Sequence, residues 1–194
     1  MVFVVLEGFS GTGKTTLAKG LEKLGWMRLA ESAHVVPKIV PVAERANTSA
    51  DFSLLGATMV YSSVISQLRG RRRIISEGYL LSDLAYARVR YDLEKSNAFP
   101  IMLEAVKAIL RETSLRPDLY ILLQAKADTI GKRQQRKNAR EKIDAELFRT
   151  RYYSALAEVH EKLGEDKVEK VYTDSGKKPA LQTILKVMKE RNVV

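Results

Sequence analysis

The sequence predicts an α/β protein whose mostly parallel sheet is covered by helices on both faces. Short apolar runs alternate with longer segments of helical spacing, which is the pattern of repeated strand and helix units. The chain has 194 residues, and about 150 residues per domain is typical, so we expect a single domain over residues 1–194. With 45% hydrophobic and 29% charged residues, the chain can bury a proper core.

Five segments are predicted as strands. The clearest is the first, residues 2–6, because Val-Phe-Val-Val-Leu is apolar throughout, as expected of a strand buried on both faces. The remaining four are Trp26–Ala30, Arg73–Ser76, Leu119–Leu123 and Val168–Tyr172. Trp26 opens its strand and is expected in the core.

Four segments are predicted as helices, and they are Lys14–Leu24, Phe52–Leu68, Phe99–Thr113 and Lys177–Arg191. Apolar residues recur in the first two at helical spacing, and in the second they are Leu55, Met59, Ile65 and Leu68. The other two helices carry Pro100 and Pro179 near their starts, where proline is tolerated. The stretch Ser32–Asp51 shows little periodicity and is expected to be loop or short irregular helix.

Charge and composition narrow the classes of function. Thirty-three basic against 23 acidic residues leave a net charge of +10, which favours anionic partners: nucleic acid, a membrane surface or phosphorylated small molecules. Cysteine is absent, so disulfides, cysteine zinc sites and thiol nucleophiles are excluded. No 18-residue apolar stretch could span a bilayer, and the start lacks the features of a signal peptide, so we expect a cytoplasmic protein.

Residues 8–15, Gly-Phe-Ser-Gly-Thr-Gly-Lys-Thr, fit the phosphate-binding P-loop pattern between a strand and a helix. The glycines let backbone N–H groups point inward, and the helix presents its positive end to the same place. Lys14 would contact the β- and γ-phosphates of ATP, and the Thr15 hydroxyl would bind Mg²⁺. The predicted ATP-binding residues are Gly8, Phe9, Ser10, Gly11, Thr12, Gly13, Lys14, Thr15 and Thr16.

Two carboxylates follow predicted strands, at the edge of the sheet where ligands bind in open α/β folds. Glu77 follows the third strand and is predicted to hold the magnesium, directly or through water, or to orient the acceptor hydroxyl. The alternative for Glu77 is a helix cap or a solvated turn. Glu31 follows the second strand, and a site role and a surface role are equally compatible with its position.

A basic segment, residues 126–142, contains seven basic and two acidic residues, a local charge of +5. Arg133, Arg136, Lys137 and Arg140 recur every three or four positions, so in a helix they share one face. Such a helical lid could stabilise the charge on a transferred phosphoryl group, and Arg133, Arg136 and Arg140 are the predicted catalytic arginines. The alternative is a solvated or nucleic-acid-binding face.

The second basic run, Arg69–Arg73, precedes the third predicted strand and so lies at the sheet edge opposite the P-loop. A solvated turn is its simplest explanation, and an anionic partner such as nucleic acid is the alternative.

These motifs together resemble the thymidylate kinase family of P-loop kinases. Residues 3–18 are similar to the family's opening strand, Glu-Gly pair and P-loop, and Ile74–Tyr86 resembles its strand, Asp-Arg-Tyr and Ala-Tyr segment. Arg116–Leu119 looks like the Pro-Asp-Leu before the fourth strand, and Lys132–Ala157 like the arginine-rich lid and following helix.

The resemblance implies a three-layer P-loop fold with a five-stranded parallel sheet and a helical lid. It also implies Mg²⁺-dependent transfer from ATP to a nucleoside monophosphate, with dTMP as the best single acceptor, and a homodimer formed through helix faces. The acceptor contacts that we expect are Ser10, Leu55, Tyr79 and Tyr86.

Several positions depart from the family pattern. Glu77 stands where the family has Asp, Gly78 replaces the Arg that grips the acceptor phosphate, and Ser10 replaces an acidic P-loop residue. The helix over residues 54–61 offers no Arg to bind the thymine edge.

Glu77 with Ser82 and Asp83 is also similar to the corresponding segment of deoxynucleoside kinases. In that interpretation, Glu31 would resemble their general base. A nucleotide-binding module with weak catalysis is the third hypothesis.

Overall fold

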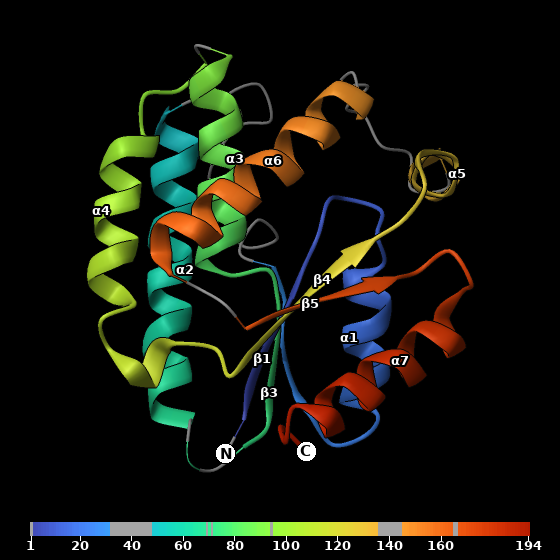
Figure 1. Cartoon of the computed structure of the whole chain (residues 1–194). Coiled ribbons are helices and arrows are strands. Elements are labelled where there is room, and N and C mark those ends of the chain that lie inside the picture. The colour runs from blue at the N-terminus through green and yellow to red at the C-terminus, as the bar shows by residue number, and fades with distance from the viewer. Residues whose placement is uncertain are drawn as a thin grey trace.

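The described residues form one five-stranded parallel sheet (Figure 1). A computed structural model of the chain describes residues 2–31, 48–68, 70, 72–93, 95–135, 145–164 and 167–194. The strands lie in the order β2-β3-β1-β4-β5. Their bounds are β1 Phe3–Glu7, β2 Met27–Leu29, β3 Ile74–Glu77, β4 Leu119–Gln124 and β5 Val168–Tyr172.

The sheet is buried on both faces because its central strands are apolar at successive positions. In β1, Phe3 and Val5 join one hydrophobic cluster, while Val4 and Leu6 join the other. Trp26, as expected, is buried in the second cluster. Alternate side chains of a strand point to opposite faces, so a fully apolar strand requires a helical layer on each side.

Helices supply both layers (Figure 1). The Phe3 cluster is covered by α2, α3, α4 and α6, and the Val4 cluster by α1 and α7. The helices are α1 Lys14–Glu22, α2 Thr48–Leu68, α3 Leu80–Asp92, α4 Phe99–Ile109, the 3₁₀ helix η4 Thr113–Leu115, α5 Ala127–Gln135, α6 Ala145–Leu163 and α7 Lys177–Glu190. The predicted α/β class and the five strands are confirmed, and no strand end differs from its predicted position by more than one residue.

Two helical segments differ from the periodicity expectations. Helix α3 shows no clear apolar stripe because nine of its 13 residues are buried, including Ser82, Asp83 and Arg90. Helix α2 begins at Thr48, so residues 48–51 of the expected irregular stretch are helical, while residues 32–47 lie outside the described part. Within α2, Leu55 and Ile65 are buried as expected, but Met59 is 49% exposed.

The parallel arrangement gathers the ends of the strands. Leu6 of β1 pairs with Glu77 of β3, and Glu7 pairs with Leu122 of β4, so both carboxylates lie at the carboxyl edge of the sheet beside the P-loop. Arg72 and Arg73 precede β3 and lie at the opposite end, as expected, while Arg69 and Arg71 are outside the described residues. Among the described helices, none is long and apolar enough to cross a membrane.

Candidate active site

Residues 8–13 connect β1 to α1, and Lys14 and Thr15 begin α1, as the P-loop pattern predicts. The surroundings of Gly8 explain why the loop needs glycine there. Gly8 has φ +146°, and a Cβ at this position would lie 2.7 Å from the Leu123 carbonyl oxygen and 2.8 Å from Thr12 Oγ1. An added side chain would therefore collide with the neighbouring strand. The close approach of loop and β4 folds the loop tightly over the sheet edge.

The loop ends at the N-terminus of α1, where Gly13 is the cap residue. The first N–H groups of a helix lack intrahelical partners, and glycine has no side chain to satisfy them, so they are available to an anion. Lys14 is nearly buried, donates to the Gly8 carbonyl oxygen at 2.6 Å, and lies 3.9 Å from Glu31 Oε2. The loop thus combines free backbone donors with a fixed ammonium group.

Thr15 at the start of α1 contacts Glu77 at the end of β3. Thr15 Oγ1 donates to Glu77 Oε2 at 2.5 Å, and Arg28 Nε donates to Glu77 Oε1 at 2.5 Å. Glu77 is fully buried, so the Arg28 charge compensates its carboxylate. A threonine hydroxyl that donates its proton keeps its lone pairs for a metal, and together with a carboxylate it forms the oxygen-donor set that Mg²⁺ prefers.

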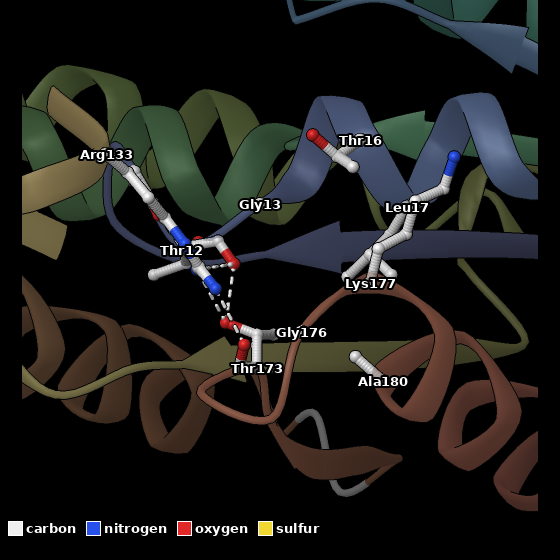
Figure 2. Close-up of a pocket in the computed structure, with 10 residues that line it drawn as sticks. Thr12, Gly13, Thr16, Leu17, Arg133, Thr173, Gly176, Lys177 and Ala180 are labelled. Atoms are coloured by element: carbon white, nitrogen blue, oxygen red, sulfur yellow. Dashed lines mark hydrogen bonds between the residues drawn. The ribbon is translucent and has the colours of Figure 1, made fainter. Parts of the chain in front are cut away.

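A cavity of about 350 Å³ adjoins the outer side of the P-loop (Figure 2). It is formed by the start of α1, by Arg133 of α5 and by the turn between β5 and α7. Its lining residues are Gly11, Thr12, Gly13, Thr16, Leu17, Arg133, Thr173, Gly176, Lys177 and Ala180. A cavity with apolar walls and a guanidinium plane, next to a phosphate-binding loop, has the chemistry for a nucleotide base.

Arg133, one of the predicted catalytic arginines, lies against the P-loop. Its guanidinium donates to the carbonyl oxygens of Gly11, Thr12 and Thr173 and to the Thr173 hydroxyl, at 2.7 to 3.3 Å. These contacts place it against the outer side of the P-loop and at the cavity. Its action on the transferred phosphoryl group stays a prediction, and Arg136 and Arg140 lie outside the described residues.

The residues expected to contact the acceptor occupy two environments. Ser10 is exposed and Tyr86 is partly exposed. Leu55 belongs to the core, and Tyr79 is 2% exposed, with its hydroxyl 2.8 Å from Ser62 Oγ and its ring edge-on to Phe3. Packing therefore accounts for Leu55 and Tyr79, whereas Ser10 is exposed and Tyr86 is partly buried against the core.

Gly78, which departs from the family pattern, has a structural reason. Its φ is +74°, a conformation that side-chain-bearing residues rarely adopt, and a Cβ would lie 3.3 Å from Ser82 Oγ. The backbone after β3 consequently follows a path that an arginine would strain. The presence of glycine rather than arginine at this position is thus tied to the local backbone conformation.

Three site residues have no motif of their own. Arg28 and Thr173 follow no pattern that would single them out, since each acts through a tertiary contact. Glu7 is part of the Glu-Gly pair before the P-loop, and its burial could have been inferred from the apolar run that it ends. In the structure it is fully buried and accepts a hydrogen bond from Ser82 Oγ.

Comparisons with known proteins bear on the fold and on the family resemblance. No family model matches the chain. The chain is 29% identical over 150 residues to a probable thymidylate kinase from Methanocaldococcus jannaschii, covering 74% of each protein. The fold is similar to thymidylate kinase from Candida albicans, with TM-score 0.72, 16% identity and 99% and 92% of the two chains covered.

It is also similar to deoxyadenosine kinase from M. mycoides with bound dCTP, with TM-score 0.68, 19% identity and 97% and 99% coverage. The resemblance to the thymidylate kinase family is therefore confirmed, and the chain has the P-loop fold of nucleoside and nucleotide kinases.

Proposed function

We propose that this protein transfers the γ-phosphoryl group of ATP to a nucleoside monophosphate, with dTMP as the first acceptor to test. The observation that carries the proposal is the Thr15 to Glu77 contact beside the P-loop, because it joins the two predicted magnesium-binding side chains at the place where phosphates would bind. The sequence similarity to a probable thymidylate kinase supports the choice of acceptor.

The geometry supports an assignment of residues to the ATP side of the site. The P-loop amides and Lys14 bind the phosphates, and the cavity beside Arg133 accepts the adenine base. Thr15 and Glu77 would hold Mg²⁺, which would neutralise the charge of the phosphate oxygens when bound. Catalysis then consists of positioning and charge stabilisation, to which we assign the lid arginines Arg136 and Arg140.

Phosphorylation of a deoxynucleoside is the second candidate, and one contact favours it. Glu31 lies at the carboxyl edge near Lys14, with its Oε2 3.9 Å from Nζ, where a carboxylate could accept the proton of an acceptor hydroxyl. Gly78 supplies no cation for an acceptor phosphate, which a nucleoside would not need. The structural similarity to a deoxyadenosine kinase is compatible with this alternative.

An acceptor panel separates the candidates. ADP release would be measured with ATP, Mg²⁺ and each of the common deoxynucleosides and nucleoside monophosphates. Turnover of dTMP supports the main proposal, and turnover of nucleosides alone replaces it with the second candidate. MgATP binding without turnover of any acceptor indicates a nucleotide-binding module and contradicts both.

We also propose a homodimer formed through α2. Its outward side presents Phe52, Met59 and Val60, which are 38%, 49% and 64% exposed. Exposed apolar side chains on one helix are characteristic of protein interfaces. Nucleic acid is a less suitable partner, since Arg133, the described arginine of the basic segment, lies against the P-loop, where the phosphates of ATP would bind.

A further inference from the structure

A buried carboxyl group lies beside the P-loop and is not used in the mechanism proposed above. Glu7 ends the central strand β1, is fully buried, and points to the same face as Phe3 and Val5. Its Oε2 accepts a hydrogen bond from Ser82 Oγ in the first turn of α3, and its Oε1 has no hydrogen-bond partner among the described residues. Ionisation of this carboxyl group would cost free energy, because one of its two oxygens would be buried without a hydrogen-bond donor.

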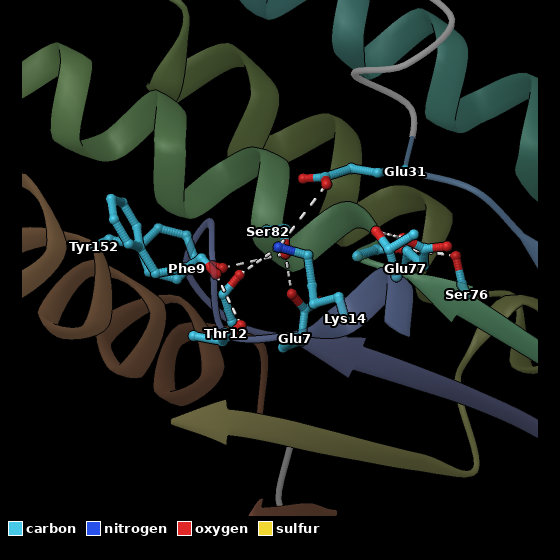
Figure 3. Close-up of polar contacts among 12 residues, drawn as sticks. Glu7, Phe9, Thr12, Lys14, Glu31, Ser76, Glu77, Ser82 and Tyr152 are labelled. Carbon is cyan, nitrogen blue, oxygen red and sulfur yellow. Dashed lines mark hydrogen bonds and ion pairs between the residues drawn. The ribbon is translucent and has the colours of Figure 1, made fainter. Parts of the chain in front are cut away.

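Ser82 extends this contact to two helices. Its hydroxyl lies 3.3 Å from the hydroxyl of Tyr152 on α6, and the ring centroids of Tyr152 and Phe9 of the P-loop are 5.8 Å apart (Figure 3). The Tyr152 ring also packs on Tyr86 of α3, with ring centroids 4.7 Å apart. Glu7 is therefore the inner end of a polar chain that connects β1 to α3 and α6. Tyr86, one of the residues that we expect to contact the acceptor, belongs to α3.

The charges around Glu7 explain why its ionisation matters. Lys14 faces it from α1, Glu31 from the end of β2, Asp83 and Tyr86 from α3, and Tyr152 from α6. Lys14 is bonded to Gly8 and near Glu31, and no ion pair joins it to Glu7 in the described part of the chain. A second negative charge here would compete with the phosphates for Lys14.

We propose that Glu7 is a positioning residue that works in its uncharged form, holding α3 and α6 against the P-loop through Ser82 and Tyr152 without adding a negative charge beside the bound phosphates. The inference rests on the proposed function in that it requires the P-loop to bind ATP. Burial raises the pKa of Glu7 to about 8, with Asp83 and Glu31 adding to the rise and Ser82 and Lys14 opposing it. Burial also raises the pKa of Tyr86 and Tyr152, so both stay neutral.

The Kd of MgATP would be measured from pH 7 to pH 9 for the wild type and for Glu7→Gln. A carboxyl with a pKa of about 8 passes from mostly neutral to mostly ionised over this range, so the wild-type Kd should rise about tenfold relative to the variant. Glutamine keeps the size and the acceptor oxygen but cannot ionise. Titration of ATP itself is common to both proteins, so parallel curves would overturn the proposal.

A nucleotide-free measurement makes the inference independent of turnover. With ¹³C-labelled glutamate, one carboxyl signal should titrate near pH 8 and be missing from Glu7→Gln. In Ser82→Ala its midpoint should move higher, because the Ser82 hydrogen bond lowers the pKa of Glu7. A Glu7 signal that titrates near pH 4.5 contradicts the inference. If the binding and titration curves follow these predictions but the protein phosphorylates no acceptor, the inference about Glu7 is supported and the proposed function is refuted.

Discussion

Lys14 brings its ammonium group to the place where the P-loop amides converge. It is nearly buried, and its bond to the Gly8 carbonyl fixes it within the loop. A cation held in this way needs little reorganisation when phosphate arrives, which is the basis of electrostatic stabilisation in phosphoryl transfer. Its contribution to function should therefore exceed its contribution to stability.

Lys14→Ala should lower kcat by about a thousandfold. Removing one group that stabilises the charge of a transition state typically lowers kcat by about two to three orders of magnitude. Lys19→Ala is the matched control, since Lys19 is exposed on the same helix. Coupled ADP assays and circular dichroism would compare the two variants. Full activity in Lys14→Ala would eliminate the proposed mechanism.

Gly78→Arg, which restores the family residue, should destabilise the protein. The positive φ and the 3.3 Å approach to Ser82 Oγ impose a cost of about 1–3 kcal/mol on any side chain at this position. Urea unfolding would measure the free energy of unfolding. Gly131→Ala is the control, because nothing lies within 4 Å of its added Cβ. Equal stability of Gly78→Arg and wild type would show that the backbone tolerates arginine.

At the level of elements, α2 has an unusual division of polar and apolar residues. Thr58 and Ser62 are buried, with Thr58 donating to Asp83, while Met59 and Val60 are exposed. The helix buries hydroxyls toward α3 and presents apolar side chains outward. Apolar spacing in the sequence predicted Met59 on the inner face, and the error arises because polar side chains satisfied by tertiary hydrogen bonds can occupy inward positions.

Met59→Asp should convert the proposed dimer to a monomer, because a carboxylate at the centre of an apolar interface would be buried without a partner. Sedimentation velocity would report the mass. Leu24→Asp serves as the comparison, since Leu24 is 48% exposed and lies after α1, on the other side of the sheet from α2. A wild-type monomer, or a Met59→Asp dimer, would refute the α2 interface.

For the whole molecule, Glu7 couples stability to pH. Burial raises its pKa from the ordinary value of 4.5, which applies to the unfolded chain, to about 8 in the folded protein. Between these two values the folded state holds a proton that the unfolded state has released. Raising the pH in this window therefore lowers the free energy of unfolding, by at most about 1.4 kcal/mol per pH unit. Above pH 8 the free energy of unfolding stops falling on account of Glu7.

The free energy of unfolding of the wild type, measured in urea and compared with Glu7→Gln, should fall between pH 5 and pH 8. The difference between the two proteins should grow across this range and become constant by pH 9. A difference that is the same at pH 5 and pH 9 would show that Glu7 has an ordinary pKa.

The sequence by itself determined the sheet, four of the helices, the P-loop and the position of Glu77 at its edge, because these depend on apolar spacing and on glycines with local roles. Tertiary structure decided the rest. Helix α3 is buried on most sides and so has no periodic apolar pattern in the sequence. Several contacts of the site join residues far apart in the chain: Glu7 with Ser82, Arg28 with Glu77, and Arg133 with Thr173. Burial and charge pairing arise only when those segments meet, so no local pattern encodes them.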